Sequence, residues 1–149
     1  MTQQYFIRNL LNIKDSNINI LEDYLTFEYI KGDKYKIIHA ELVYYAEKCP
    51  YCQSREIIKW GTKTTNIKIL KISSDNSILR LKKQRFKCKS CGKTFIAETD
   101  FVDKNCSISN DVKLAVTLKL KNNTSEKHIA QDLKISNRTV NRVVTSFYK

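Results

Sequence analysis

The sequence predicts an α+β fold: an N-terminal helix and a β-hairpin with a four-cysteine zinc ribbon, followed by a three-helix helix-turn-helix domain. Three observations support this prediction. Two CxxC pairs lie in the middle of the chain, apolar residues alternate with polar ones before them, and the apolar period becomes 3.6 residues after them. We expect a helix and hairpin scaffold at 1–48, the ribbon at 49–100, a linker at 101–106 and the helix-turn-helix at 107–149.

The two CxxC pairs are the strongest signal in the chain. Cys49 and Cys52 form the first pair, and Cys88 and Cys91 form the second. Two thiolates at positions i and i+3 can turn toward one point, and two such pairs supply the four sulfur ligands that Zn²⁺ accepts in structural sites. We therefore predict one structural Zn²⁺ in a closed zinc ribbon with four cysteine ligands. The 35 residues between the pairs exceed the usual spacing of about 15–20, which indicates an elaborated ribbon.

Two other interpretations of these cysteines are weaker. The Cys-Pro-Tyr-Cys motif resembles the active site of glutaredoxins, in which a thiolate of low pKa attacks disulfides. That fold needs a helix directly after the motif and a second proline beside the thiols. Pro50 is the sole proline, and residues 53–61 are typical of a short strand. Four ordinary buried cysteines would have no reason to fall in two matched pairs, and the fifth cysteine, Cys106, is expected to lie outside the metal site.

The net charge of +12 is distributed unevenly along the chain. Residues 1–48 carry 6 basic and 7 acidic side chains, residues 49–100 carry 12 and 4, and residues 101–149 carry 9 and 4. A positive field on two neighbouring segments indicates a polyanionic partner, most simply double-stranded DNA. No apolar run approaches the ~18 residues of a membrane span and no signal peptide is evident. We therefore expect a cytoplasmic, nucleoid-associated protein with neither a membrane nor a small-molecule substrate as partner.

Apolar spacing before and inside the ribbon predicts the first elements. We expect a short helix at 3–13, a hairpin from runs at 25–29 and 38–44 with Gly32 in the turn, and strands at 56–60, 67–72 and 78–87 separated by breaks at 61–66 and 73–77. Trp60 and Phe86 are expected in the core or shielding the metal. The last strand is the most basic, and it is either a phosphate-binding surface or the solvated face of an edge strand. Its candidate DNA-binding residues are Arg80, Lys82, Lys83, Arg85 and Lys87.

The C-terminal segment has helical periodicity in three parts. We expect a helix at 110–121 capped by Ser107 or Ser109, a second helix capped by Thr124 or Ser125, and a third, capped by Ser136, that runs to the C-terminus. The apolar side of the third helix holds Val140, Val143, Val144 and Phe147. Lys134 occupies the turn position that glycine usually fills, which requires a left-handed backbone at a cost of ~1–2 kcal/mol or a different turn.

Polar side chains of the third helix point away from its apolar side. Arginine pairs with guanine and asparagine with adenine in the major groove, so this face is typical of a recognition helix. A plain three-helix bundle with a solvated face is the alternative. The candidate DNA-binding residues here are Ser136, Asn137, Arg138, Asn141, Arg142 and Thr145.

Taken together, these motifs resemble the N-terminal half of bacterial insertion-sequence transposases of the ISL-three family. The specific part is the segment from Arg85 through Cys88 and Cys91 to Phe95. The resemblance implies that the zinc ribbon and helix-turn-helix bind the terminal inverted repeats of the transposon, while a following RNase H-like domain cuts and joins DNA with a carboxylate triad and divalent metal. Because the sequence stops at Lys149, we expect a protein that is not an enzyme: a truncated transposase or the N-terminal part of one. The full-length transposase or a second copy would be its protein partners.

Two alternatives come from other functional classes. A stand-alone helix-turn-helix transcription regulator with a structural zinc ribbon would use the same residues on promoter DNA. An RNA-binding zinc ribbon would need exposed aromatic side chains for base stacking, and the sequence offers too few that look exposed.

Overall fold

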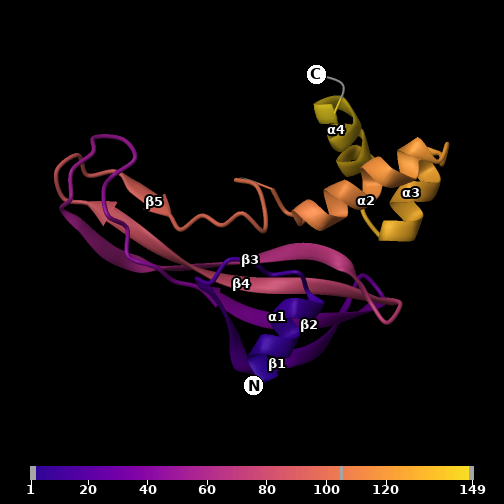
Figure 1. Ribbon diagram of the computed structural model, residues 1–149, viewed down its shortest axis with the longest axis horizontal. Helices are drawn as coiled ribbons and strands as arrows, with labels where there is room; N and C mark the ends of the chain where they lie inside the picture. Colours follow the sequence, from indigo (N-terminus) through magenta and orange to yellow (C-terminus); the bar gives the residue numbers. More distant parts are fainter. Residues whose placement is uncertain (1–2, 105, 148–149) are drawn as a thin grey trace.

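The computed structural model describes residues 3–104 and 106–147 (Figure 1). The elements are α1 (Gln3–Leu10), β1 (Ile18–Ile30), β2 (Asp33–Leu42), β3 (Ile57–Ile72), β4 (Asp75–Cys88), β5 (Thr94–Ile96), α2 (Asn110–Lys121), α3 (Glu126–Leu133) and α4 (Asn137–Phe147). The expected continuation of the last helix to the C-terminus and the predicted inward side chain of Phe147 lie outside the described part. Among the described helices, none has the length and apolar character needed to cross a membrane.

One mixed sheet contains all five strands. Its order is β1-β2-β4-β3, and β5 pairs with β4. The β1–β2 and β3–β4 pairs are antiparallel hairpins, whereas residues 35–42 of β2 run parallel to residues 76–83 of β4. This parallel pairing joins the N-terminal hairpin to the two long strands that lead to the cysteines.

Two-residue turns close both hairpins. Lys31 and Gly32 have φ of 52° and 86°, and Ser73 and Ser74 have φ of 51° and 68°. Two consecutive residues with positive φ give a turn whose twist matches that of the flanking strands. The predicted turn at Gly32 is confirmed. The predicted break at 61–66 is wrong, because β3 continues through it with only a register irregularity between Lys59 and Thr62.

The predicted fold class, a helix and hairpin scaffold with a four-cysteine ribbon followed by a three-helix helix-turn-helix domain, is wrong. The structure is a mixed α+β fold with one five-stranded sheet and four short helices, three of which lie in the C-terminal part. The error has a physical cause. Parallel pairing of β2 with β4 joins residues about forty positions apart, and local periodicity carries no information about such pairing.

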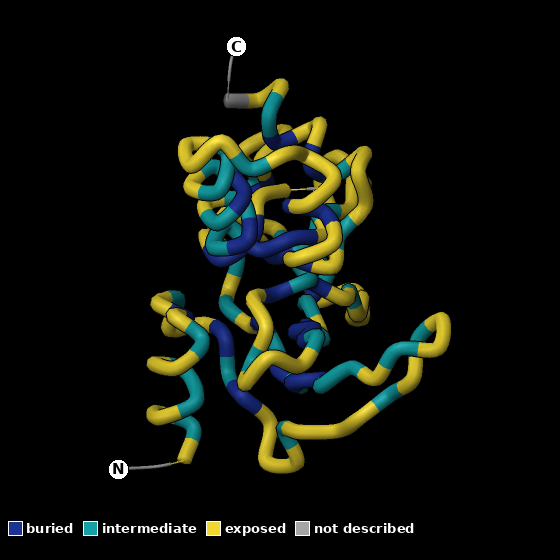
Figure 2. The backbone as a smooth tube through the Cα atoms, turned by 90° about the vertical axis from the view of Figure 1, so that its right-hand side faces the viewer, coloured by how far each residue is buried: buried dark blue, intermediate teal, exposed yellow. Residues whose placement is uncertain are grey.

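The main core lies on the face of the sheet that α1 and the segment after β5 cover. Its fully buried residues come from all of the longer strands and include Ile18, Leu42, Ile67, Leu79 and Leu81. Ile7 and Leu11 pack against this core from the N-terminal helical segment, although α1 itself contains no fully buried residue (Figure 2). This helix therefore rests on the sheet surface and leaves part of its apolar side exposed.

The three C-terminal helices pack around a second core. Val112, Val116, Ile129, Val140 and Val143 are among its buried residues, and the inner sides of the helices are buried in Figure 2. The helical spacing of these apolar residues explains why each helix buries only one side.

Serine side chains cap each of these helices. The Val112 N–H donates to Ser109 Oγ (3.3 Å), the His128 N–H to Ser125 Oγ (3.2 Å), and the Thr139 N–H to Ser136 Oγ (3.0 Å). The structure thus selects Ser109 and Ser125 from the predicted pairs of caps and confirms Ser136.

Lys134 adopts the left-handed backbone, one of the two alternatives predicted for this turn. Its φ is 57°, and its backbone N–H donates to the Ala130 carbonyl at the C-terminal end of α3. The side chain forms a 2.8 Å ion pair with Asp33, the first residue of β2. This contact ties the helices to the nearby end of the sheet.

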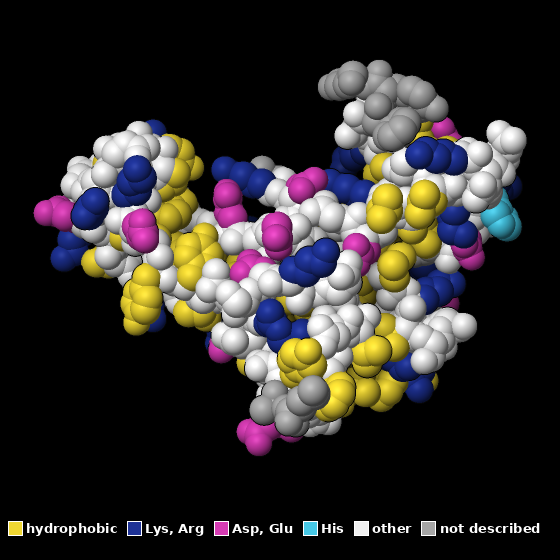
Figure 3. Space-filling view, viewed as in Figure 1, with side chains coloured by type: hydrophobic (Ala, Val, Ile, Leu, Met, Phe, Trp, Pro, Cys, Tyr) yellow, Lys and Arg dark blue, Asp and Glu magenta, His cyan; other side chains and the backbone are white. Residues whose placement is uncertain are grey.

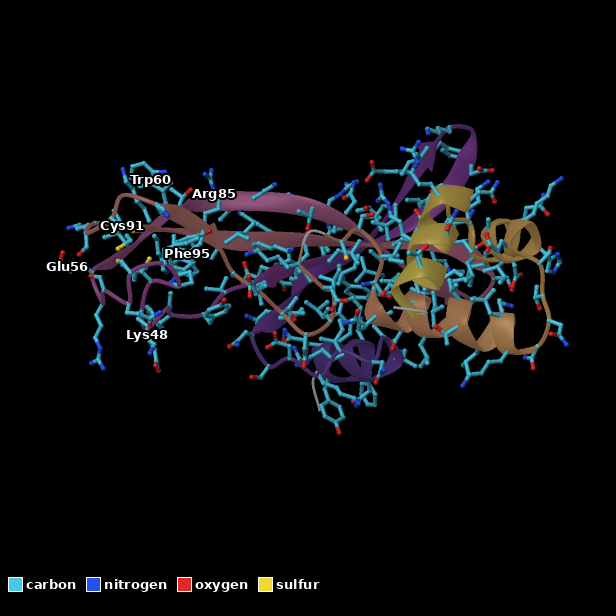
Figure 4. The ribbon with its side chains drawn as sticks, turned by 90° about the horizontal axis from the view of Figure 1, so that it is seen from above. Lys48, Glu56, Trp60, Arg85, Cys91 and Phe95 are labelled. Atoms are coloured by element: carbon cyan, nitrogen blue, oxygen red, sulfur yellow. The ribbon has the colours of Figure 1, made fainter. Side chains whose placement is uncertain are left out.

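The cysteines and the C-terminal helices occupy opposite ends of the molecule (Figures 1 and 4). The N–H of Lys68 donates to the Ser107 carbonyl (2.7 Å), and the N–H of Ser109 donates to the Lys68 carbonyl (2.9 Å), so the chain enters α2 along the edge of β3. Lys68 is eleven residues from Ile57, which adjoins the cysteines, and this is roughly 35 Å at about 3.3 Å per residue.

Candidate metal centre and nucleic-acid interface

The structure brings the four predicted metal ligands together. Their sulfur atoms all lie within 4.8 Å of one another, with 3.7 Å between Cys49 and Cys91 and 3.5 Å between Cys52 and Cys88. Sulfur atoms at the corners of a tetrahedron with Zn–S bonds of ~2.3 Å would be about 3.8 Å apart. None of the four forms a disulfide. One structural Zn²⁺ fits this site, and four protein ligands leave no coordination position open to a substrate.

The two CxxC loops have equivalent backbone geometry. In the first, the Gln53 N–H donates to the Cys49 carbonyl (2.9 Å) and the Cys49 N–H to the Ser54 carbonyl (2.8 Å). In the second, the Gly92 N–H donates to the Cys88 carbonyl (2.9 Å) and the Cys88 N–H to the Lys93 carbonyl (3.0 Å). Each pair of bonds folds the chain into a tight knuckle that turns both thiols toward one point.

Polar contacts join the two knuckles directly. The hydroxyls of Ser54 and Ser90 lie 2.8 Å apart, and the Lys89 N–H donates to the Glu56 carbonyl (2.9 Å). The long strands β3 and β4 bring the first knuckle and the second to the same end of the sheet, which explains the wide spacing of the CxxC pairs in the sequence.

Hydrogen bonds and burial set the pKa values of the thiols in opposite directions. The Cys91 N–H lowers the pKa of Cys88 to about 6, against the effect of burial. Burial raises the pKa of Cys49, but hydrogen bonds led by the Cys52 N–H outweigh it and lower the pKa overall. The Ser54 N–H lowers the pKa of Cys52, but burial and the neighbouring sulfurs raise it to about 12. Zn²⁺ supplies the positive charge that allows all four thiols to ionise together.

The residue that follows each CxxC motif has a left-handed backbone, and this gives a test of the knuckle geometry. Gln53 has φ of 64° and Gly92 has φ of 74°. A side chain in this conformation costs ~1–2 kcal/mol, whereas glycine adopts it freely. We expect Gln53→Gly to raise the free energy of unfolding of the zinc-loaded protein by about 1 kcal/mol in denaturant titrations.

The equivalent position provides the matched control. A Cβ atom added at Gly92 meets no heavy atom within 4 Å, so Gly92→Ala introduces backbone strain without a steric clash. It should therefore lower the free energy of unfolding by a similar amount. The same sign of change for both substitutions would contradict the equivalence of the knuckles.

The predicted DNA-binding residues of α4 all lie on the surface. Ser136, Asn137, Arg138, Asn141, Arg142 and Thr145 are exposed, whereas Val140 and Val143 are buried on the other side. Four of these exposed residues, together with Ser146, line an open hollow of about 490 Å³. The arrangement places two guanidinium groups and one amide on a single accessible face.

The predicted basic residues of β4 are divided between the two faces of the sheet, because side chains alternate along a strand. Arg80 and Lys82 share one face, and Lys83, Arg85 and Lys87 share the other. Lys82 is exposed and the other four are partly buried. The structure therefore does not bring these five cations together in one patch.

Two of these cations also have partners within the protein. The guanidinium of Arg80 forms an ion pair with Glu28 and donates to Asn66 Oδ1 (2.9 Å). The ammonium of Lys87 lies 4.3 Å from the centre of the Trp60 ring. Burial, together with the charge of Lys63, lowers the pKa of Lys83.

Sequence reasoning missed the exposed aromatic side chains at the cysteine end. Tyr45 is 86% exposed, Tyr51 54% and Trp60 44%, so the prediction that Trp60 is a core or shielding residue is wrong. Phe86 is buried as predicted, and its ring stacks on that of Phe95 at 5.3 Å. The available signal was the concentration of tyrosines around Lys48, since Tyr44 and Tyr45 precede it and Tyr51 lies inside the first CxxC pair.

Comparison with known proteins identifies the segment that carries the metal centre. A search of curated proteins found no match, and neither did a search of solved structures. Residues 46–91 match the family model described as the zinc-finger of transposase IS204/IS1001/IS1096/IS1165. This match includes all four cysteines. The cysteine end of the chain is therefore similar to the zinc ribbon of ISL-three-type transposases.

Proposed function

We propose that this protein binds double-stranded DNA, recognises the terminal inverted repeats of a transposon through α3 and α4 acting as a helix-turn-helix, and performs no strand transfer itself. The observation that carries the proposal is the exposed polar face of α4, where Arg138, Asn141 and Arg142 lie opposite a buried valine side. Arginine and asparagine form bidentate hydrogen bonds with guanine and adenine in the major groove, so this helix has the chemistry to read sequence.

The two CxxC knuckles and the adjoining ends of β3 and β4, called the metal end below, supply a second DNA contact in this proposal. The family match of residues 46–91 supports a role for this end in a transposase, and the closed four-sulfur site supports a structural role for its zinc. Along β3, roughly 35 Å separates the metal end from Lys68, where the chain turns toward α2. The metal end and α4 would therefore contact a duplex at two separate points.

The spacing suggests a footprinting experiment. Hydroxyl-radical footprinting on a terminal inverted repeat should give two separate protected patches, one from α4 and one from the metal end. A single patch would contradict the two-point contact. Equal affinity for inverted-repeat and random duplexes would contradict sequence recognition, and a preference for promoter DNA would indicate a transcription regulator instead.

A further inference from the structure

A groove with aromatic walls lies beside the zinc knuckles. It has a volume of about 710 Å³, within the range of about 300–1,000 Å³ typical of ligand pockets. The first CxxC loop and the chain leading into it form one wall, and the segment around the end of β5 forms the other. The side chains that line it are Tyr44, Tyr45, Ala46, Glu47, Lys48, Pro50, Tyr51, Phe95, Ile96, Glu98 and Lys104.

Two tyrosines in this groove present their rings to solvent. Tyr45 is 86% exposed and Tyr51 is 54% exposed, whereas Tyr44 and Phe95 are partly buried against Phe86. Lys48 projects from the side of the metal end opposite Trp60, with Phe95 between them (Figure 4). Tyr45 and Tyr51 are therefore accessible rings in a groove whose lining also includes Tyr44 and Phe95.

A lysine accompanies each of the exposed rings. The ammonium of Lys59 lies 5.6 Å from the centre of the Tyr45 ring, and that of Lys93 lies 4.8 Å from the centre of the Tyr51 ring. Both lysines are exposed, so their ammonium groups can also reach a bound anion. Each tyrosine thus pairs a flat apolar surface with an adjacent positive charge.

The two segments around the zinc knuckles are strongly basic, whereas the groove lining itself balances Glu47 and Glu98 with Lys48 and Lys104. Residues 45–60 and 85–95 contain seven basic and two acidic side chains. Zn²⁺ bound by four thiolates carries two negative charges, so the net charge of these segments would remain positive. Within the part of the chain that the structure describes, none of these seven cations forms an ion pair, whereas Lys36, Lys113 and Lys134 elsewhere do. Basic and apolar side chains intermingle over this end of the molecule (left in Figure 3).

We propose that this groove binds unpaired nucleotides, with Tyr45 and Tyr51 stacking on bases and Lys59 and Lys93 contacting phosphates. Exposed aromatic rings with basic side chains beside them are the features that bind single-stranded nucleic acid, because every base has a face that can stack. Bases within a duplex have both faces covered by their neighbours, so this surface favours unpaired DNA over paired DNA. The unpaired lysines favour a nucleic acid over an apolar protein segment.

This inference rests on the proposed function, and it refines the role of the metal end. With α4 on a duplex, the groove would contact the DNA at a second point, because the cysteines and the C-terminal helices occupy opposite ends of the molecule. There it would meet nucleotides that are unpaired at a break, an end or a distorted junction.

The test compares two tyrosine variants on single-stranded and paired probes. The probes are a fluorescein-labelled 20-nucleotide oligo-dT and a fully paired 30-base-pair inverted-repeat duplex, titrated at one fixed salt concentration. Tyr45→Ala and Tyr51→Ala should each weaken oligo-dT binding by about tenfold and duplex binding by less than twofold, because stacking on one aromatic ring is lost. A 5-iodouracil-substituted oligo-dT should photo-crosslink to Tyr45 or Tyr51, as identified by mass spectrometry.

The matched control is Tyr29→Ala. Tyr29 is 76% exposed but lies on β1, in the N-terminal third that carries no net positive charge, and its removal should leave both affinities unchanged. Zinc content of one ion per chain verifies that each variant is folded at the metal end. Oligo-dT affinity that is the same in the wild type and both groove variants would overturn the inference. The proposed recognition of duplex DNA by α4 would not be affected by that result. Crosslinking confined to α4 would also overturn it.

Discussion

A Cys88→Ser protein is expected to bind no zinc and to lose the folded structure of the metal end. The four sulfurs within 4.8 Å of one another hold this end together, and a serine hydroxyl is a poor replacement for a thiolate ligand. Structural zinc contributes on the order of 10 kcal/mol or more to folding, which is comparable with the ~5–15 kcal/mol net stability of an ordinary domain. The zinc content measured by elemental analysis should fall from one ion per chain to near zero.

Hydrogen exchange can show how far the damage extends. The C-terminal helices have a separate buried core around Val116, Ile129 and Val140, at the opposite end of the molecule from the knuckles. We expect amide protection to disappear from the knuckles and the adjoining ends of β3 and β4 while it persists in α2. Uniform loss of protection would show that the metal stabilises the whole chain.

Cys106 provides the matched control for this substitution. It lies outside the four-sulfur cluster, where its sulfur accepts a hydrogen bond from Lys113 Nζ (3.4 Å). Cys106→Ser replaces this acceptor with an oxygen and should retain one zinc per chain. Zinc retained in Cys88→Ser, or lost in Cys106→Ser, would contradict the assignment of the ligands.

Substitution of the α4 arginines is expected to have the largest effect on DNA binding. Arg138 and Arg142 are exposed on the face that we propose enters the major groove. A bidentate contact to guanine is worth ~1–3 kcal/mol, so Arg138→Ala or Arg142→Ala should weaken binding to the preferred duplex by about tenfold or more. Affinity for random duplex should fall much less, and fluorescence anisotropy with both probes measures the difference.

Lys14→Ala is a charge-matched control for the arginine variants. Lys14 is also exposed, but it lies in the N-terminal third, where acidic and basic side chains nearly balance. Its removal should change affinity by less than twofold. Equal losses for Lys14→Ala and Arg138→Ala would mean that net charge, not a recognition face, determines binding. A wild-type affinity that does not change with salt would exclude phosphate contacts altogether.

Local sequence signals predicted the metal site and the starts of the three C-terminal helices well, whereas the first helix, expected at 3–13, ends at Leu10. The metal ligands could be predicted without tertiary information, because the two cysteines of each CxxC pair can turn both thiols toward one point. The helix at 110–121 and the serine caps followed from the 3.6-residue period and from the preference of a hydroxyl for orphan backbone N–H groups. The sequence did not show whether Ser107 or Ser109 caps this helix, because the choice depends on the path by which the chain enters α2.

Predictions that depended on pairing between distant segments were wrong. The run at 61–66 looked like a break because of Gly61 and its polar neighbours, yet β4 provides a partner along that length and β3 continues through it. Trp60 was expected in the core or shielding the metal, but it is exposed beside the register irregularity between Lys59 and Thr62, with the Lys87 ammonium over its ring.

The sequence by itself determined the four metal ligands, the uneven charge and the polar face of the last helix, since each depends on residues close together in the chain. Only the tertiary structure decided that β2 pairs with β4 in one sheet, that the metal and α4 stand at opposite ends of it, and that Tyr45 and Tyr51 are exposed. The reason is physical. Exposure and separation are set by contacts between residues tens of positions apart, and local periodicity does not encode which distant strand will supply them.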